Sequence, residues 1–376
     1  MKVLQTIASL NASSGGTSTC TYELLAAMND AGYPVDLLTL RPQSHTENML
    51  GEDVFIKAYP HDARLPLAIS RNIRRALAES NYDLYHTNGL WMDVNHVTCA
   101  HARKVGKPYI ISPHGMLYPQ AFAISSWKKR LMLSLGHRRD LQQATCIHVT
   151  CKQEMEHCRA FGLKQPIAVI PNPVQIPSYL NELSKSNDGI FRVGFLGRFH
   201  HIKNIESIIR AWAMLQLSDS ELLLYGDGEP GYVEKLKALV RSTNAPHIRF
   251  MGFVNGREKY EALANFDVLC APSHQENFGM SIAEALLAGT PVIASTGTPW
   301  EELNTFQCGW WRDNSVESLC ECIKEAQSLS SNELRAMGER GKQLILSSYS
   351  SAKVSQMMYQ LYCWLLGKQE KPDFVY

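Results

Sequence analysis

The chain contains 376 residues, more than one ordinary hydrophobic core accommodates, so its length predicts two domains. Hydrophobic residues make up 45% and charged residues 19% of the sequence, as in many globular enzymes. The formal net charge of +1 argues against bulk nucleic-acid binding, and no stretch approaches the roughly 20 consecutive apolar residues that span a membrane. We therefore expect a cytoplasmic protein that binds no nucleic acid.

The chain opens with the segment MKVLQTIASL, which resembles a short signal peptide. Gln5, Thr6 and Ser9 interrupt its apolar run, and no small-residue cleavage pattern follows, so we interpret the segment as a first β-strand. A Ser/Gly loop comes next, and then a helical pattern that Gly32 ends. Later strand patterns alternate with helical ones, at residues 34–40, 83–87, 108–112, 146–150 and 167–171. Such alternation predicts a parallel sheet with helices on both faces.

Residues 171–189 are rich in Pro, Ser and Asn and are predicted to link two domains. The alternation then restarts, with strands expected at residues 191–197, 221–227, 247–252, 266–272 and 291–295. We therefore predict an α/β protein of two Rossmann-like doubly wound domains, residues 1–172 and 188–350, with a helix at about 351–376 returning to the first domain. Because open α/β sheets bind ligands beyond the carboxyl ends of their strands, a ligand cleft is expected between the domains.

Ten cysteines are dispersed through the chain, mostly in apolar runs, and no Cys-x-x-Cys pair occurs. This pattern favours reduced thiols that pack as small hydrophobic groups. Two clusters combine histidine and cysteine without the spacing of a zinc site: His96, Cys99 and His101, and His148, Cys151, His157 and Cys158. We therefore expect no metal and no cofactor.

One glycine motif resembles a dinucleotide-binding fingerprint. Gly226, Gly228 and Gly231 follow a predicted strand and precede a helical pattern. The fingerprint also needs an acidic residue about 20 positions later, at the end of the next strand, and the segment APHIRFMGF in that region contains no carboxylate. We therefore interpret the motif as a tight strand-to-helix turn, which argues against a nicotinamide-dependent dehydrogenase.

Two other loops that follow strands are suited to an anion. Gly15 and Gly16 stand between the first strand and the first helix, where backbone N–H groups can approach a phosphate, although such loops are equally common as plain turns. Arg198 and Lys203 follow the strand at 191–197, and two fixed cations there would stabilise a departing diphosphate. The alternative for these cations is solvated surface charge.

The segment HQENFGMSIAEALLAGTPVIAS places Glu276 in a loop and Glu284 inside the helix expected between Gly279 and Gly289. The start of that helix offers unpaired N–H groups to an anion. Each carboxylate can accept two hydrogen bonds from a vicinal diol. A nucleotide sugar has this layout, with sugar hydroxyls, a diphosphate and ribose hydroxyls in a row. A capping carboxylate with a solvated helical glutamate is the plain alternative.

A set of motifs in chain order carries a resemblance to a known family: SSGG, HTNGLW, SPHGMLYP, VIPNPV, FLGRFHHIKN, YGDGE, MGFV, APS and ENFGMSIAEALLAGTPVIAS. Over nearly its whole length the sequence resembles the retaining glycosyltransferases of family 4, which have the GT-B fold. The resemblance implies a nucleotide diphospho-sugar donor, UDP- or GDP-linked, held by the second domain. It implies a glycan or polyprenyl-diphosphate-linked glycan as the acceptor, held by the first domain.

The resemblance further implies transfer of a hexose-type sugar with retention of configuration, in the synthesis of O-antigen, lipopolysaccharide, capsule or exopolysaccharide. No Asp-x-Asp motif is present, which fits a reaction without a metal. Arg198 and Lys203 would stabilise the leaving diphosphate, while Glu276 would bind the sugar and Glu284 the ribose. The other site residues implied are His114 near the sugar and, for the donor, Gly15, Gly16, Phe253, Asn277, Phe278, Gly279, Met280 and Ser281. Trp300 and Glu301 depart from the family pattern and receive no role.

The segment 125–144 combines Trp, Leu and Met with a set of basic residues, Lys128, Lys129, Arg130, Arg138 and Arg139. In the first domain of such an enzyme, a basic amphipathic helix could lie peripherally on the anionic inner face of the cytoplasmic membrane and meet a lipid-linked acceptor. The alternative is a helix that packs its apolar face on its own domain.

Two other functions remain open. A GT-B-like nucleotide-sugar epimerase would need an additional acid/base carboxylate near the sugar, and it would convert the donor without an acceptor. A non-catalytic nucleotide-sugar-binding protein would lose affinity on substitution of Lys203 or Glu276, with no turnover to lose.

Overall fold

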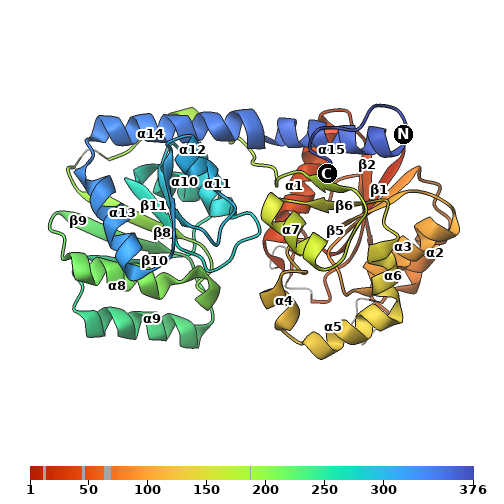
Figure 1. The fold of residues 1–376 in the computed structure, drawn as a ribbon, viewed down its shortest axis with the longest axis horizontal. Helices are drawn as coiled ribbons and strands as arrows, with labels where there is room; N and C mark the ends of the chain where they lie inside the picture. Colours follow the sequence, from red (N-terminus) through yellow and green to blue (C-terminus); the bar gives the residue numbers. More distant parts are fainter. Residues whose placement is uncertain (12–13, 45–46, 63–68, 187) are drawn as a thin grey trace. The chain divides into compact units, whose positions relative to one another are not determined.

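The computed structural model describes residues 1–376 except 12–13, 45–46, 63–68 and 187. Ser13 of the expected Ser/Gly loop therefore lies outside the described residues. The chain forms two compact units: Met1–Pro173 with Ser351–Tyr376, and Val174–Ser350. Each unit contains one parallel sheet covered by helices (Figure 1). We refer to them as the first unit and the second unit.

The sheet of the first unit has seven strands in the order β3-β2-β1-β4-β5-β6-β7. Every neighbouring pair is parallel. Its strands are β1 (Val3–Ser9), β2 (Val35–Leu40), β3 (Ile56–Tyr59), β4 (Leu84–Asn88), β5 (Tyr109–Ser112), β6 (Cys146–Val149) and β7 (Ile167–Val169). Because β1 lies between β2 and β4, the strand order reverses beside β1, and open α/β sheets bind ligands at such a position.

Helices of the first unit pack on both faces of its sheet. One core joins α1 to the C-terminal helix α15, through Leu25 and Met358 among others, and the other joins α2, α3, α6 and α7 to the opposite face. The helices are α1 (Gly16–Asp30), α2 (Arg71–Ala78), α3 (Asp93–Lys104), α4 (Pro119–Ala123), α5 (Ser126–Met132), α6 (Arg138–Gln142), α7 (Lys152–Ala160) and α15 (Ser351–Leu365). Burial of these apolar faces holds α15 in the first unit, although α15 lies far in sequence from α1 and from the sheet that it covers.

The sheet of the second unit has six parallel strands in the order β10-β9-β8-β11-β12-β13. They are β8 (Phe191–Leu196), β9 (Ser220–Tyr225), β10 (Ile248–Gly252), β11 (Val268–Ala271), β12 (Val292–Ser295) and β13 (Gly309–Arg312). The helices are α8 (Ile205–Leu215), α9 (Pro230–Thr243), α10 (Gly256–Asn265), α11 (Met280–Leu287), α12 (Glu302–Thr305), α13 (Val316–Ser328) and α14 (Ser331–Leu344). Two separate cores, on the two faces of the sheet, again give three layers.

The two Rossmann-like parallel-sheet domains expected from the sequence are confirmed, and every expected strand is present. Two edge strands, β3 and β13, escaped prediction. Both are only partly buried and lack a continuous apolar run, which is the signal that marks the central strands. Part of the expected linker packs on the second unit, where Val174 and Leu180 are buried in its core.

Candidate functional site

Three loops of the second unit leave the same edge of its sheet. They follow β8, β11 and β12, which are neighbours in the sheet and run parallel, so their carboxyl ends lie together. The loop after β8 carries Arg198 and Lys203, the loop after β11 carries Glu276, and the loop after β12 carries Trp300. Parallel topology therefore gathers residues that stand up to about 100 positions apart in sequence.

Lys203 and Glu276 form an ion pair between the first two of these loops. The side chains of Lys203 and Glu276 are 21% and 17% exposed, so the pair is largely shielded but reachable. Ser273 Oγ donates to the same Glu276 oxygen at 2.9 Å, and His274 N donates to Ile202 O at 2.7 Å. The structure thus brings together two residues that the sequence analysis placed in different roles, one on the diphosphate and one on the sugar.

Arg198 is exposed and lies on the same loop as Lys203. Burial lowers the pKa of His200, and the positive charges of His201, Arg198 and Lys203 lower it further. Those effects show that several positive charges act on one small region beside β8. Such a region is suited to an anion, and no ion pair of Arg198 occurs within the described part of the chain.

Helix α11 begins next to the Lys203–Glu276 pair. Gly279 precedes it with φ 86° and ψ 67°, a left-handed conformation that favours glycine. Its first turn contains no acidic residue and no side chain caps it. The first hydrogen bond of the helix runs from Ile282 N to Gly279 O at 3.0 Å, so the N–H groups of Met280 and Ser281 precede the helical ladder. Those two donors and the helix dipole favour an anion at this end.

Trp300 fixes the loop that leads into α11. Its side chain is 1% exposed, and its Nε1 donates to the carbonyl of Phe278. The Phe278 ring is also buried and packs against Trp300 at 5.3 Å and Tyr349 at 5.8 Å between ring centroids. Trp300 therefore has a packing role, and Phe278 presents its backbone rather than its ring to a ligand, while Glu301 is exposed. The sequence analysis missed this anchor because no pattern pairs residues 278 and 300.

Glu284 lies in α11 and pairs with Lys259 of α10, Oε1 to Nζ 2.7 Å. Burial raises the pKa of Glu284, and the charge and hydrogen bond of Lys259 offset part of that increase. The side chain of Glu284 is 13% exposed, so its carboxylate is held in place while one edge stays reachable. Lys259 was not predicted, since nothing in the segment GREKYEAL distinguishes it from a surface lysine.

Two glycines of the motif GDGEPG, Gly226 and Gly228, allow two loops to pack closely against each other. An added Cβ would lie 1.9 Å from Gly197 O at Gly226 and 2.2 Å from Phe199 O at Gly228. Gly197 N donates to Tyr225 O at 3.1 Å, which holds the two loops together. The motif is thus a turn that supports the loop of Arg198, in agreement with the interpretation that rejected a dinucleotide fingerprint. Phe253, which follows β10, is 72% exposed, and within the described part of the chain it makes no hydrogen bond or ring contact with the residues around α11.

In the first unit, Gly15 and Gly16 form the start of α1, after β1. Gly15 has φ 82° and no side chain caps the helix, and an added Cβ at either glycine would meet no atom of the described residues within 4 Å. No acidic residue lies in the first turn. This helix start is therefore open, as an anion-binding loop must be.

His114 follows β5 of the first unit and has φ 50°, which is unusual for a residue other than glycine. Its Nε2 lies 3.1 Å from Oδ1 of Asn88, at the end of β4. The next residue, Gly115, donates its N–H to Oε1 of the buried Glu154 at 2.5 Å. Burial lowers the pKa of His114 to about 3, and the charge of a protonated His148 would lower it further, so His114 is neutral at pH 7. The structure thus fixes the loop and the ring of His114.

The basic segment 125–144 forms α5, a π-helical turn (Leu133–His137) and α6, with a kink at Gly136. Its inner face is anchored by Leu133, His137, Asp140 and Leu141, which are buried. Large apolar side chains remain exposed on the other side: Ile124 (70%), Trp127 (66%), Leu131 (50%) and Leu135 (62%). Trp127 and Leu131 are four residues apart and lie on one face of α5, whereas Ile124 precedes α5 with an extended backbone and Leu135 follows it in the π-helical turn. The helix therefore packs on its own unit and exposes a second apolar face.

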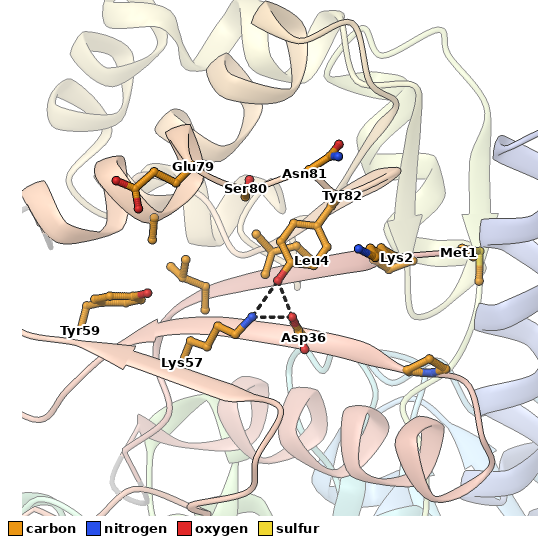
Figure 2. A pocket seen from close by; sticks show the side chains of 14 residues that line it. Met1, Lys2, Leu4, Asp36, Lys57, Tyr59, Glu79, Ser80, Asn81 and Tyr82 are labelled. Atoms are coloured by element: carbon orange, nitrogen blue, oxygen red, sulfur yellow. Dashed lines mark hydrogen bonds and ion pairs between the residues drawn. The ribbon is translucent and has the colours of Figure 1, made fainter.

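A cavity of the first unit lies at the amino-terminal ends of its strands, opposite the ends from which the loops of Gly15 and His114 leave (Figure 2). It has a volume of about 590 Å³ and is lined by the starts of β1, β2 and β3. Lys57 Nζ lies 2.6 Å from Asp36 and 2.9 Å from the Tyr82 hydroxyl, so these polar groups satisfy one another. None of the predicted site residues lines this cavity.

Within the described ranges, no group of three or more His, Cys, Asp and Glu side chains is arranged to hold a metal ion. None of the ten cysteines forms a disulfide, and all ten are buried. Among the helices in the described part of the chain, none combines the length and the apolar character needed to cross a membrane.

Two family models match the chain in succession. A glycosyl transferase 4-like domain matches residues 15–173, and the glycosyl transferases group 1 model matches residues 182–344. Together they include most of both units. The chain belongs to the group 1 glycosyltransferases. The family resemblance expected from the sequence is thereby confirmed. The expectation that the protein is a transferase is confirmed with it.

Relatives of this glycosyltransferase are distant. A phosphatidyl-myo-inositol mannosyltransferase of Mycolicibacterium smegmatis is 25% identical over 297 residues, which is 75% of this chain and 72% of that protein. The putative glycosyltransferase EpsF of Bacillus subtilis is 25% identical over 315 residues, 78% of this chain and 79% of that protein.

Solved structures establish the GT-B fold of this glycosyltransferase. Sucrose-phosphate synthase from Thermosynechococcus elongatus aligns with TM-score 0.75 and 20% identity, over 98% of this chain and 100% of that chain. Anabaena HepE in complex with UDP aligns with TM-score 0.74 and 17% identity, over 97% of this chain and 100% of that chain. At such identities the likeness concerns the fold alone.

Proposed function

We propose that this glycosyltransferase transfers a hexose-type sugar from a nucleotide diphospho-sugar to a glycan acceptor, with retention of configuration and without a metal. The observation that carries the proposal is the Lys203–Glu276 ion pair beside the uncapped start of α11. One end of this arrangement offers positive charge and N–H groups, and the other offers a carboxylate. A sugar diphosphate needs both, side by side.

The donor would lie along the edge formed by the loops after β8 and β11. Arg198, Lys203 and the N–H groups of Met280 and Ser281 would hold the diphosphate, and the backbone of Asn277 to Gly279 would approach the sugar. Glu276 would accept hydrogen bonds from sugar hydroxyls, and Glu284 from the ribose. Gly15 and Gly16 would offer N–H groups to a phosphate, and Phe253 would lie near the base. UDP and GDP both satisfy this chemistry, and HepE, of the same fold, has been solved with UDP and with UDP-glucose.

The chemistry would rest on stabilising the leaving group. As the bond from the anomeric carbon to the β-phosphate oxygen breaks, negative charge builds on the diphosphate and positive charge on the sugar ring. Fixed cations and N–H groups bind that state better than the ground state, because their strength grows with the charge they face. Arg198 and Lys203 would then do what a divalent cation does elsewhere. The acceptor hydroxyl would attack from the face that the diphosphate leaves, and a β-phosphate oxygen would take its proton.

The acceptor would be a glycan or a polyprenyl-diphosphate-linked glycan, in the synthesis of a cell-surface polysaccharide such as O-antigen, capsule or exopolysaccharide. A membrane-bound acceptor is supported by the exposed apolar side chains of Ile124, Trp127, Leu131 and Leu135. Exposed basic side chains flank them, at Lys128, Arg130, Arg138 and Arg139. Apolar insertion together with attraction to anionic lipid is the usual mode of peripheral membrane binding, so we propose a cytoplasmic enzyme that associates with the inner face of the membrane.

The donor proposal is tested by thermal-shift measurements with nucleoside diphosphates and their sugars. Strong stabilisation by UDP, GDP or one of their sugars is expected, because a ligand that binds only the folded state raises its stability. Product analysis by NMR with the stabilising donor and candidate acceptors then reports the anomeric configuration. Stabilisation by none of these compounds would overturn the proposal, whereas donor conversion to a new sugar without any acceptor would favour an epimerase. Binding of donors without turnover of any kind would favour a binding protein.

Membrane association is tested by co-sedimentation with vesicles of phosphatidylcholine alone or mixed with phosphatidylglycerol. The wild-type protein is expected in the pellet with the mixed vesicles only. Trp127→Ser with Leu131→Ser is expected to abolish pelleting, and Met214→Ser, at an exposed position of the second unit, is the control. Equal pelleting with both vesicles would remove the electrostatic part of the idea.

A further inference from the structure

A continuous chain of hydrogen bonds crosses the interior of the first unit and ends on His114. It runs through residues of β1, β4, β5, β6 and the C-terminal helix α15, and its inner members are at most 5% exposed. The links are His114 Nε2 to Asn88 Oδ1, 3.1 Å; Asn88 Nδ2 to Gln5 Oε1, 2.7 Å; Gln5 Nε2 to Tyr362 Oη, 2.7 Å; Tyr362 Oη to His86 Nδ1, 2.9 Å; His86 Nε2 to Ser112 Oγ, 2.6 Å; Ser112 Oγ to His148 Nδ1, 2.6 Å; and His148 Nε2 to Ile170 O, 2.9 Å.

The far end of this chain fixes its direction. The carbonyl oxygen of Ile170 can only accept, so Nε2 of His148 must carry a proton. His148 is neutral, since burial lowers its pKa to about 4, and its Nδ1 must therefore accept. Ser112 has one hydroxyl proton and donates it to His148, so its oxygen accepts from Nε2 of His86. Each assignment follows from the one before it.

The same logic continues to His114. Burial lowers the pKa of His86 well below its ordinary value, so Nδ1 of this neutral ring accepts from the Tyr362 hydroxyl. The Tyr362 oxygen can then only accept, which turns the NH₂ of Gln5 toward it and the carbonyl of Gln5 toward Asn88. Asn88 must present its NH₂ to Gln5, and its carbonyl therefore faces His114. Nε2 of His114 must donate, so the position of its proton is set by the Ile170 carbonyl at the other end of the hydrogen-bond chain.

The opposite nitrogen of His114 is left as an acceptor. A neutral imidazole carries one N–H proton, and Nδ1 accepts no hydrogen bond from the part of the protein that the structure describes. The charged or titratable groups near this loop are His148, His86 and, from α7, Glu154. The oxygens of Glu154 take the N–H of Gly115 and of Thr150, so this carboxylate holds the backbone of the loop.

We propose that this one-way chain holds His114 as its Nε2–H tautomer, so that Nδ1 accepts a hydrogen bond from a hydroxyl of the sugar substrate, with Asn88 and Tyr362 as positioning residues. The identity of that hydroxyl as a sugar hydroxyl rests on the proposed function. The tautomer does not rest on it. The C-terminal helix thereby acts on the chemistry through Tyr362, although it lies about 250 positions from His114 in sequence.

The tautomer is measured directly by NMR of the full-length protein with ¹⁵N-labelled histidine. Long-range ¹H–¹⁵N correlations distinguish a protonated from an unprotonated ring nitrogen, and the variants His114→Gln, His86→Gln and His148→Gln assign the signals. We expect the Nε2–H form for all three rings, unchanged between pH 6 and 8. A wild-type His114 in the Nδ1–H form, or one that titrates in this range, would overturn the proposal.

Tyr362→Phe tests the positioning role. This variant removes the hydroxyl that donates to His86 and accepts from Gln5. The orientations of the Gln5 and Asn88 side-chain amides are then no longer fixed. The His114 signal is expected to become a mixture of tautomers, and kcat to fall about tenfold, the value of one hydrogen bond. The thermal shift induced by a nucleoside diphosphate without sugar is expected to stay unchanged, because neither Tyr362 nor His114 is among the proposed diphosphate contacts. Tyr359→Phe, on the same helix, keeps its ring stacked on Tyr33 at 4.1 Å and is the control.

A second variant keeps the test decisive if Tyr362→Phe does not fold. Asn88→Asp has the same shape but cannot donate to Gln5, and its charge favours a protonated His114 that donates from both nitrogens. The ring should then titrate near neutral pH, and turnover should rise with pH along the same curve. A pure Nε2–H signal with full turnover in both variants would show that the chain does not position His114. If the wild-type protein transfers no sugar but shows the predicted tautomers, the proposed function fails and the hydrogen-bond chain stands.

Discussion

Lys203 and Glu276 form an ion pair at the carboxyl edge of the second sheet, although they lie 73 positions apart in sequence. The pair joins two groups that a nucleotide sugar would bind separately, one through its diphosphate and one through its sugar. A diphosphate that approaches Lys203 therefore competes with Glu276. This competition gives the first prediction, in which removal of the Glu276 charge preserves or strengthens diphosphate binding but lowers turnover of the donor.

Glu276→Gln is expected to bind the nucleoside diphosphate without sugar as tightly as the wild type or a few-fold tighter, because Lys203 no longer has a competing carboxylate. Turnover of the donor is expected to fall about 10²- to 10³-fold, since a group that contacts the reacting sugar is lost. Calorimetric titration and initial rates measure the two quantities. Weaker diphosphate binding with unchanged turnover would contradict the assignment of Glu276 to the sugar.

Glu284→Gln is expected to weaken nucleotide binding without lowering the stability of the fold. Burial raises the pKa of Glu284 above its unfolded value of about 4.5, so its stabilising contribution is complete below that value and is lost as the pH rises through the folded pKa. At pH 7 the buried carboxylate therefore costs stability, and Tm of the variant should equal the wild-type value or exceed it by about 1–3 °C. Affinity for UDP or GDP should fall about tenfold.

The exposed Glu258 provides the control for that experiment, because Glu258→Gln changes the same charge near Lys259 without touching α11. It should alter neither quantity. A large drop in Tm for Glu284→Gln alone would mean that its pair with Lys259 stabilises the fold more than burial of the carboxylate destabilises it.

Gly226→Ala is expected to damage the site through the loop of Arg198. The new Cβ would lie 1.9 Å from Gly197 O, and φ at Gly226 is 140°, so the two loops must separate. We expect a loss of about 1–3 kcal/mol in the free energy of unfolding and weaker diphosphate binding. Gly231→Ala is the matched control, since its Cβ would meet only the side chain of Glu229, at 3.0 Å. Equal damage from both substitutions would contradict the packing role of the first glycine.

Buried neutral histidines predict a loss of stability in mild acid. Burial lowers the pKa of His148 to about 4 and of His137 to about 4, below the unfolded value of 6.5. The stability that these neutral rings confer is complete above pH 6.5 and is lost as the pH falls toward 4. At pH 5 each such ring lowers the free energy of unfolding by about 2 kcal/mol relative to pH 7. The reason is that the histidine binds a proton in the unfolded protein but not in the folded one. A Tm that stays constant from pH 7 to pH 5 would contradict these assignments.

The sequence predicted the central strands well because parallel strands covered on both faces are short apolar runs between glycine and proline loops. It predicted the helix at Met280–Leu287 to within two residues, since Gly279 and Gly289 bracket it. The edge strands β3 and β13 were missed because partial exposure removes that apolar signal.

The site was predictable where residues follow strands, as Arg198, Lys203 and Glu276 do. The partners of Glu284 and Phe278 were not, because Lys259 and Trp300 become their neighbours only through the packing of the fold. The same holds for the chain of hydrogen bonds to His114. Its members come from β1, β4, β5, β6 and α15, and no local pattern links Gln5 to Tyr362.

Calorimetric titration of UDP and GDP into wild-type protein, Lys203→Ala and Lys237→Ala tests the central claim most directly. Lys237 is the control because it pairs with Glu234 on the surface of α9, with 42% of its side chain exposed. We predict that the better nucleotide binds Lys203→Ala at least about tenfold more weakly than the wild type, and Lys237→Ala equally well. Equal affinity of all three proteins for both nucleotides would contradict a diphosphate site at Lys203.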